Sequence, residues 1–141
     1  MKKTVVLSIC GTQYYPGQDP DVIELVTEGT LEYRDGGWDI CYEETELTGL
    51  AGVTTTFRLE PGYVVLERTG RLQSKMVFQQ GIPHDSLYQM EFGALMMTVC
   101  AQMIDASISD HGGTVDLQYS IAIEHNEAGM VEYHLDVRPK E

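Results

Sequence analysis

The sequence predicts an all-β protein, a single antiparallel β-barrel of about 8–10 strands. Three observations predict it. Apolar and polar residues alternate along most of the chain, short turn-forming segments separate the alternating stretches, and no segment shows a convincing helical stripe. Since successive side chains of a strand point to opposite faces, each predicted strand has one apolar face and one polar face.

The C-terminal part of the chain shows the alternation most clearly. Every second residue is apolar from Val115 to Ile123, and again from Val131 to Val137. Residues 126–129, between these stretches, include the Asn and Gly that tight turns favour. The two stretches therefore predict a β-hairpin with one apolar face.

Ten strands are expected along the chain. In order, they cover residues 4–12, 22–33, 38–44, 52–60, 63–68, 72–79, 86–92, 95–109, 114–124 and 130–137. Most connections are short and rich in Gly, Pro, Asp and Asn, which predicts antiparallel hairpins. Because no helix is expected to cover the sheet, the strands must bury their apolar faces against one another. A barrel does so without leaving free sheet edges.

The second strand contains a glycine in its interior. Gly29 packs no side chain and allows sharp curvature, so it predicts a bend or a bulge. A sheet that closes into a barrel requires such curvature.

The register of the fourth, fifth and sixth strands can also be predicted. We expect a hairpin tip at residues 61–62 and a three-residue loop at residues 69–71. The resulting pairs are Leu59 with Val64, Phe57 with Leu66, Leu66 with Ser74 and Val64 with Met76. This register places the apolar side chains of all three strands on one face.

Residues 92–99 are the one segment in which a helix competes with a strand. Gly93 disfavours the helix. An apolar series of period two favours a long, bent strand, and its members are Leu95, Met97, Val99, Ala101 and Met103.

Composition restricts the functional classes. The 141 residues fit one domain, residues 1–141. Nine Lys and Arg against 22 Asp and Glu give a net charge of −13, which repels a phosphate backbone. A nucleic-acid partner is therefore not expected. The acidic excess favours solubility, with a basic protein partner as the alternative.

The sequence predicts a cytoplasmic protein. Its N-terminus starts like a signal peptide, but no small-residue cleavage site follows. No segment approaches the roughly 18 apolar residues that span a bilayer. Cys10, Cys41 and Cys100 lack the Cys-x-x-Cys spacing, so we expect three reduced thiols within strands.

Five short stretches of the chain form a pattern of their own: Tyr42–Glu44, Val65–Gly70, Phe78–Gly81, Tyr88–Gly93 and Gly113–Tyr119. In their order and spacing they resemble the bacterial YwiB-like proteins, a family of unknown function. The resemblance covers most of the chain from Val22 to Val137 and implies a calycin-like, lipocalin-like β-barrel. It implies no activity and no catalytic residues, because the family has none established. Analogy with other calycins implies a small apolar or amphipathic ligand inside the barrel.

Arg68 is the first candidate for a ligand-binding residue. Its position in the alternation places it on the inward face, where a charged group needs a partner. We expect that partner to be Glu44 or the acidic group of a ligand, which a guanidinium can bind through two parallel hydrogen bonds. The alternative is an arginine at the barrel rim with its charge in water.

Aromatic side chains are the remaining candidates for the barrel interior. Tyr33, Trp38, Tyr42, Tyr119 and Tyr133 fall on predicted inward faces, and Phe57 faces inward with them. Such residues line binding cavities, although small barrels are also simply filled by them. Met76, Met97 and Met103 are expected in the same interior.

Other motifs give no clear site. Arg58, Arg68, Arg71 and Lys75 lie in neighbouring hairpins, but their predicted directions alternate, which disfavours a single basic patch. The histidines lack metal-ligand spacing, and no nucleotide or nucleophile motif is present, so we expect no metal and no cofactor. Glu43 and Glu44 point to opposite faces and cannot act as an acid–base pair.

The sequence therefore favours a binding protein over an enzyme. We expect a small apolar or amphipathic anionic ligand in the barrel, bound by Arg68, Tyr42, Tyr119, Tyr133, Phe57, Trp38 and Glu44. The alternative is an acidic protein-interaction module without a ligand. No set of nucleophile, base and electrophilic stabiliser is visible.

Overall fold

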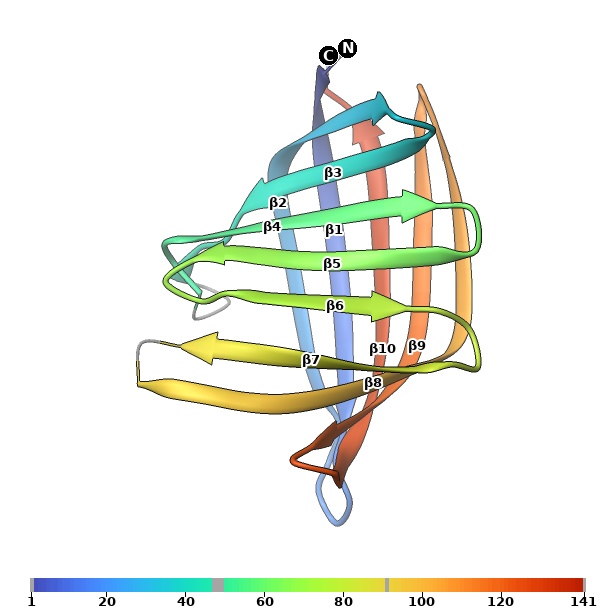
Figure 1. Ribbon diagram of the computed structural model, residues 1–141. Coiled ribbons are helices and arrows are strands. Elements are labelled where there is room, and N and C mark those ends of the chain that lie inside the picture. Colours follow the sequence, from blue (N-terminus) through green and yellow to red (C-terminus); the bar gives the residue numbers. More distant parts are fainter. Residues whose placement is uncertain (1, 47–49, 91, 141) are drawn as a thin grey trace.

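The computed structural model, which describes residues 2–46, 50–90 and 92–140, confirms the all-β prediction (Figure 1). The strands are β1 (Lys2–Tyr14), β2 (Asp21–Arg34), β3 (Gly37–Glu43), β4 (Val53–Glu60), β5 (Tyr63–Gly70), β6 (Ser74–Phe78), β7 (Pro83–Met90), β8 (Gly93–Ser109), β9 (Gly112–Ile123) and β10 (Asn126–Pro139). They form one sheet in the order β6-β5-β4-β3-β2-β1-β10-β9-β8-β7. All neighbours in this sheet are also neighbours in sequence, except β1 and β10.

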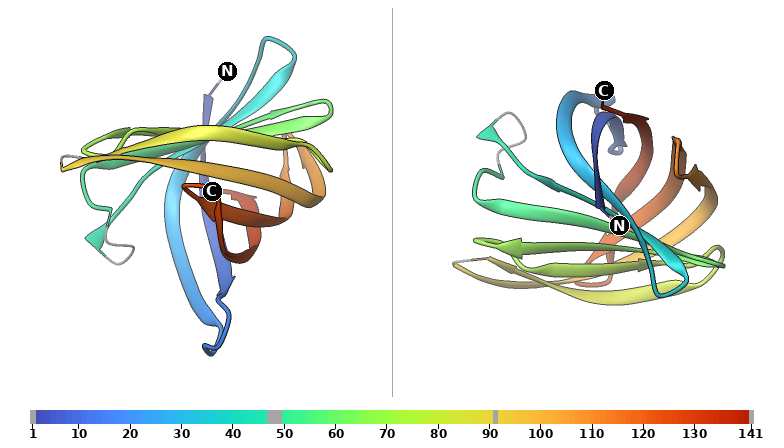
Figure 2. Two further views of the ribbon diagram at one scale, coloured as in Figure 1. Left: turned by 60° about the horizontal axis from the view of Figure 1, so that its bottom comes forward. Right: turned by 90° about the horizontal axis from the view of Figure 1, so that it is seen from above.

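The sheet curls into a nearly closed antiparallel barrel, so that its two outer strands, β6 and β7, lie side by side (Figures 1 and 2). At this seam Gln73 and Gln89 exchange two backbone hydrogen bonds of 2.8 Å. Among the described residues, isolated bridges rather than a continuous ladder join the two strands. The barrel is therefore closed by packing and a few hydrogen bonds at this point.

The alternation predicted from the sequence defines the core. Along β1, Val5 and Leu7 are at most 1% exposed, and Val115 and Leu135 of β9 and β10 are fully buried. Toward the tips of the β1–β2 and β9–β10 hairpins, the same inward faces line a cavity instead. One part of the barrel is thus packed with side chains, and the other part is hollow.

The predicted register between β5 and β6 is wrong by two residues. Leu66 pairs with Met76, and Arg68 pairs with Ser74, whereas the predicted pairing of Leu59 with Val64 is confirmed. A three-residue loop is too short because Leu72 is buried and Gln73 bonds to Gln89 across the seam. A shift by two residues keeps every side chain on its predicted face.

The prediction that Met103 lies in the barrel interior is also wrong. Met103 is 38% exposed, although the apolar series in β8 predicts it inside. Ala101 pairs with Tyr119 and Met103 with Gln118, so Gln102 is the extra residue of a β-bulge. The bulge reverses the alternation, and Ile104 packs against the core in place of Met103.

Strand β2 is strongly curved (Figure 2), and Gly29 lies within it. A Cβ atom there would lie 2.5 Å from the Cys41 carbonyl oxygen and 2.7 Å from Leu7 Cδ1. The glycine therefore lets two strands and a core side chain approach one another, as curvature of the sheet requires.

The three cysteines are free thiols, as expected. No helix within the described ranges is long and apolar enough to cross a membrane.

Candidate functional site

The hollow part of the barrel contains a cavity of about 450 Å³. Inward residues of β1, β3, β5, β9 and β10 contribute to its wall, and its opening lies near the hairpin tips, where Tyr15, Ile23 and Met130 line it. Tyr15 and Ile23 are 38% and 41% exposed, whereas Tyr42 and Tyr119 are 5% and 6% exposed. The two tyrosines therefore lie deeper in the barrel than the residues at the opening.

A polar row crosses the inner wall at this depth. Tyr42 of β3 pairs with Thr55 of β4, Thr55 with Arg68 of β5, and Arg68 with Ser74 of β6. Glu44 follows directly after β3 and is also buried. We call Tyr42, Glu44, Thr55, Arg68 and Ser74 the polar belt. Five polar side chains on an inner wall oppose the apolar burial that stabilises a barrel, so each needs a compensating partner.

Glu44 is the acidic group of the polar belt. Its carboxylate accepts a hydrogen bond of 2.5 Å from Thr55 Oγ1. The same oxygen, Oε2, lies 4.0 Å from Arg68 Nε. This confirms the predicted ion pair with Arg68, but 4.0 Å is too long for a hydrogen bond. The two charges attract each other without satisfying the guanidinium.

Two atoms of the polar belt are buried without any hydrogen-bond partner among the described residues. They are Arg68 Nε and Ser74 Oγ. Arg68 and Ser74 are cross-strand partners, so their Cβ atoms lie roughly 5 Å apart on one face. An unsatisfied buried group costs about 1–3 kcal/mol, and more when it is charged. Two such groups side by side form a site with unused hydrogen-bonding capacity.

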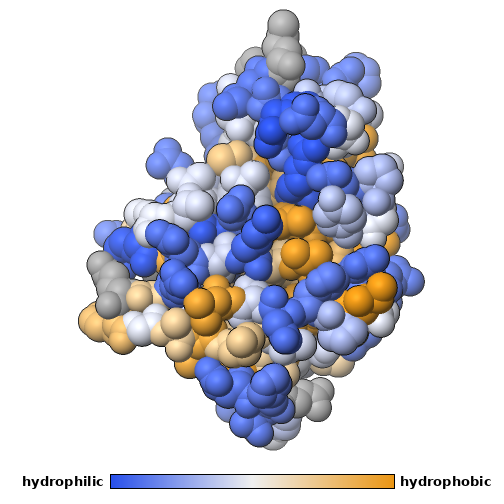
Figure 3. Space-filling view, in the orientation of Figure 1, coloured by the Kyte–Doolittle hydropathy of each residue, from blue (hydrophilic) through white to orange (hydrophobic). Residues whose placement is uncertain are grey.

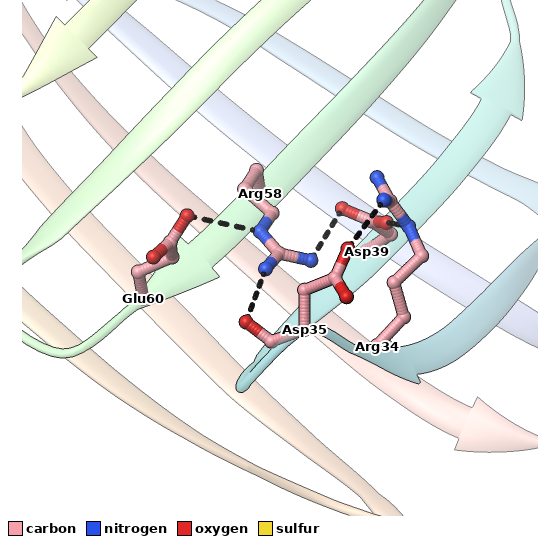
Figure 4. Close-up of polar contacts among 5 residues, drawn as sticks. All are labelled: Arg34, Asp35, Asp39, Arg58 and Glu60. Atoms are coloured by element: carbon pink, nitrogen blue, oxygen red, sulfur yellow. Dashed lines mark hydrogen bonds and ion pairs between the residues drawn. The ribbon is translucent and has the colours of Figure 1, made fainter.

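Arg58, in the neighbouring strand β4, shows what a partnered arginine looks like in this fold (Figure 4). Its guanidinium donates to Glu60 Oε2 at 3.2 Å, to Asp39 Oδ1 at 3.4 Å and to the Asp35 carbonyl oxygen at 3.1 Å. Arg34 donates to the same Asp39 at 2.6 Å. Arg58 and Arg68 therefore have similar burial, with side chains 15% and 17% exposed, but opposite hydrogen-bonding states.

Three tyrosines, Tyr42, Tyr119 and Tyr133, line the cavity together with Arg68 and Glu44 of the polar belt. The Tyr42 and Tyr133 hydroxyl oxygens are 3.5 Å apart. Burial, aided by the charge of Glu44, raises the pKa of Tyr42 to about 12, and burial raises the pKa of Tyr119 to about 12. Burial also raises the pKa of Tyr133 well above its ordinary value. All three hydroxyls are thus protonated at neutral pH, and that of Tyr42 already interacts with Glu44 and Tyr133.

The positive charge of Arg68 acts in the lowering direction on the pKa of all three tyrosines, although burial outweighs it. Arg68 and Glu44 are the charged residues among those that line the cavity with the three rings.

The structure brings five of the predicted site residues together and leaves two apart. Arg68, Tyr42, Tyr119, Tyr133 and Glu44 line the cavity. Phe57 is fully buried in the core, where its ring packs against Tyr133 at 5.4 Å, and Trp38 packs against the same core. Neither reaches the cavity wall, because both lie on the packed side of the polar belt.

The prediction that Tyr33 belongs to the barrel interior is wrong. Tyr33 shares the face of Trp38, with ring centroids 4.9 Å apart, but it is 53% exposed. The residue lies near the end of β2, where the barrel opens to solvent, so an inward direction does not bury it.

Sequence reasoning missed Thr55 and Ser74, which belong to the polar belt although they do not line the cavity. Both are polar residues at inward positions of otherwise apolar strands, which is the signal that could have found them. It also missed Gly11, which lines the cavity opposite Tyr133 in the β1–β10 ladder.

The outer wall carries a smaller hollow of about 270 Å³, whose lining includes Cys10, Asp116, Glu132 and His134. The face in Figure 3 is mostly hydrophilic, with hydrophobic side chains interspersed over its middle and lower parts. His134 Nδ1 lies 2.6 Å from Asp116 Oδ1 on the outside of β10 and β9. Across the described part of the chain, no group of three or more His, Cys, Asp or Glu side chains is placed to hold a metal ion.

Comparison with known proteins decides the family. The model of the Domain of unknown function (DUF1934) matches residues 7–136. The chain belongs to the DUF1934 family. The DUF1934 barrel is similar to the crystal structure of the ywiB protein from Bacillus subtilis, with a TM-score of 0.78 over 96% of this chain and 92% of that chain. At 18% identity this likeness shows a shared fold, and together with the match to the family model it is consistent with the expected YwiB-like family. No curated protein matches the DUF1934 chain.

Proposed function

We propose that this protein binds a small amphipathic anion in the barrel cavity, with Arg68 as the anchor of the acidic group. The observation that carries the proposal is the pair of buried, unpartnered polar atoms in the polar belt, Arg68 Nε and Ser74 Oγ. A guanidinium that faces a cavity without hydrogen-bond partners can bind an acidic group through two parallel hydrogen bonds.

The remainder of the cavity supports an apolar body for the ligand. Ile9, Leu25, Leu95, Met97, Ile121 and Ile123 line it. Burial of such a wall against an apolar ligand stabilises a complex by about 25 cal/mol per Å². A volume of about 450 Å³ is within the usual size range of small-molecule sites.

A pair of fluorescent probes tests the proposal. 8-Anilinonaphthalene-1-sulfonate has an anionic head, and N-phenyl-1-naphthylamine has the same rings without the sulfonate. We expect both to bind, and we expect Arg68→Ala to weaken the sulfonate probe about tenfold or more while leaving the neutral probe unchanged. A charged hydrogen bond is worth about 1.5–3 kcal/mol, which corresponds to this factor.

Arg58→Ala is the matched control, because it removes the same charge from the outer wall of β4. It should leave the affinity of both probes unchanged. Arg68→Ala leaves Glu44 without its ion-pair partner, so the double variant Arg68→Met, Glu44→Gln gives a neutral cavity of similar volume as a check on folding. If the sulfonate probe binds no better than the neutral one, or if Arg58→Ala weakens it equally, the proposal is wrong.

Native mass spectrometry of the protein from its own cells then identifies the ligand. A copurifying small molecule that is absent from the Arg68→Ala protein would support the proposal. A basic protein partner released at raised salt would favour an interaction module instead.

A further inference from the structure

We infer that the ligand carries a single carboxylate, and that this carboxylate enters first and is held at the polar belt while the apolar body extends toward the opening. The inference rests on the proposed function and narrows it from amphipathic anions in general to monocarboxylic acids in one orientation. The hydrogen-bonding inventory, the charge balance and the depth of the polar belt each support it.

The hydrogen-bonding inventory of the cavity is dominated by donors. Arg68 offers N–H groups only, and the hydroxyls of Tyr42 and Tyr133 are protonated at neutral pH because burial raises the pKa of each tyrosine. Glu44 is the acceptor of the polar belt, and Thr55 already donates to it. A head group that only accepts hydrogen bonds complements this set, and an ammonium or an amide N–H does not.

The charge balance favours one negative charge over two. Arg68 and Glu44 form an ion pair at 4.0 Å, so together they contribute no net charge to the cavity. A carboxylate therefore brings one uncompensated negative charge next to a guanidinium. A phosphate dianion would bring two negative charges close to the Glu44 carboxylate, whose side chain is 2% exposed, and desolvation makes that repulsion costly.

Geometry favours a planar head group. The fork of N–H groups on a guanidinium matches the two oxygens of a carboxylate, which accept two parallel hydrogen bonds. Ser74 does not itself line the cavity, but it is the cross-strand partner of Arg68 on the same face, so its buried, unpartnered Oγ can donate to an oxygen held by Arg68. This uses both unsatisfied atoms of the polar belt at once.

The orientation follows from depth. Ser74 and Glu44 are each 6% exposed, whereas Ile23 at the opening is 41% exposed. Glu44 therefore lies at a closed part of the cavity wall, whereas Tyr15, Ile23 and Met130 lie at its opening. An acid that enters with its apolar end first would place hydrocarbon against the polar belt and leave both unpartnered atoms unsatisfied.

Competition among four ligands with the same eight-carbon chain tests the inference. Octanoate, octan-1-ol, octylamine and octyl phosphate each displace N-phenyl-1-naphthylamine at pH 8.5, where the acid is a monoanion, the amine is a cation and the phosphate is a dianion. We expect octanoate to displace the probe at a concentration about tenfold lower than octanol. Octylamine and octyl phosphate should be weaker than octanoate.

Two variants separate head binding from tail binding. Ser74→Ala should weaken octanoate a few-fold and leave octanol unchanged, whereas Arg68→Met, Glu44→Gln should make octanoate and octanol equal. Arg58→Ala should change neither. Octyl phosphate or octylamine equal to octanoate would overturn the inference while leaving a cavity that binds the probe. If the neutral probe itself does not bind, the proposed function fails as well.

Discussion

Ser74 is the residue at which stability and binding are expected to oppose each other. Its hydroxyl oxygen is buried and has no partner among the described residues, so Ser74→Ala removes an uncompensated polar group from the inner wall. We expect the free energy of unfolding without ligand to rise by about 1 kcal/mol. Urea unfolding monitored by circular dichroism measures this.

Thr55→Val is the matched comparison, because it removes a hydroxyl that does have a partner. Glu44 then loses the hydrogen bond from Thr55 Oγ1, and the free energy of unfolding should fall by about 1–3 kcal/mol. Should Ser74→Ala destabilise the protein as Thr55→Val does, the Ser74 hydroxyl has a partner in solution, and its place in the proposed site is wrong.

The sequence alone was sufficient to predict that Arg68 faces inward, but not to predict that Ser74 is its cross-strand partner. The inward direction follows from period-two alternation, which survives any even shift in register. Ser74 was expected opposite Leu66, because the loop appeared to need three residues. Its actual length depends on the bonds between Gln73 and Gln89, and these join strands at opposite ends of the sheet order. Local turn rules contain no information about that contact.

Two glycines of the inner wall allow a prediction at the level of the strands. A Cβ atom at Gly29 of β2 would meet the Cys41 backbone at 2.5 Å, whereas one at Gly11 of β1 would meet only Tyr133 Cδ2 at 3.7 Å. We expect Gly29→Ala to lower the free energy of unfolding by about 1–3 kcal/mol through overpacking. Gly11→Ala should leave it unchanged or raise it by up to about 1 kcal/mol.

Thermal and urea unfolding of the two variants side by side check this prediction. Both replace a strand glycine by the same residue, so the intrinsic preference of alanine cancels in the comparison. Equal effects at the two positions would mean that β2 and β3 do not approach closely at Gly29.

In the long strand β8, the pattern within the strand does not predict the direction of every side chain. Alternation identified the strand correctly and favoured it over a helix, but it placed Met103 inside. A bulge at Gln102 reverses which side chains face inward after Ala101. Nothing local marks that residue, because glutamine has no special backbone preference of the kind that Gly29 signals. The bulge is set by pairing with β9, which is a property of the sheet.

At the scale of the molecule, the three buried tyrosines predict alkaline sensitivity. The pKa values of Tyr42 and Tyr119 are raised from 10.0 to about 12, and that of Tyr133 is raised well above 10.0. Between pH 10 and 12 the unfolded chain therefore releases protons that the folded chain retains. Stability from these groups is complete below pH 10 and is lost as pH rises toward 12, at up to about 1.4 kcal/mol per pH unit for each tyrosine.

Urea unfolding between pH 9 and 12 measures this loss. Tyr119→Phe removes one of the three ionisations, so its stability should fall less steeply with pH than that of the unchanged protein. An identical slope for the variant would show that Tyr119 ionises normally in the folded barrel.

The whole fold was predictable because many weak local signals agree. Ten alternating stretches and their turns specify hairpins, and hairpins without a covering helix specify a curled sheet. The cavity was not predictable in the same way. Val5 and Ile9 of β1 follow the same pattern and are both buried, yet Ile9 lines the cavity and Val5 does not. The difference depends on how side chains from all strands fill the interior, which the pattern along one strand does not contain.

The order of strands in the sheet also divides the polypeptide into two consecutive halves. β1 to β6 form one series of hairpins and β7 to β10 another, and the ladder between β1 and β10 is the continuous border that they share. A cut between Gln80 and Gly81 would interrupt no strand and would yield two fragments, each a complete meander. Residues of both fragments line the cavity, so neither fragment alone could bind a fluorescent dye there. The fluorescence of the bound dye would therefore report the reassembly of the two fragments.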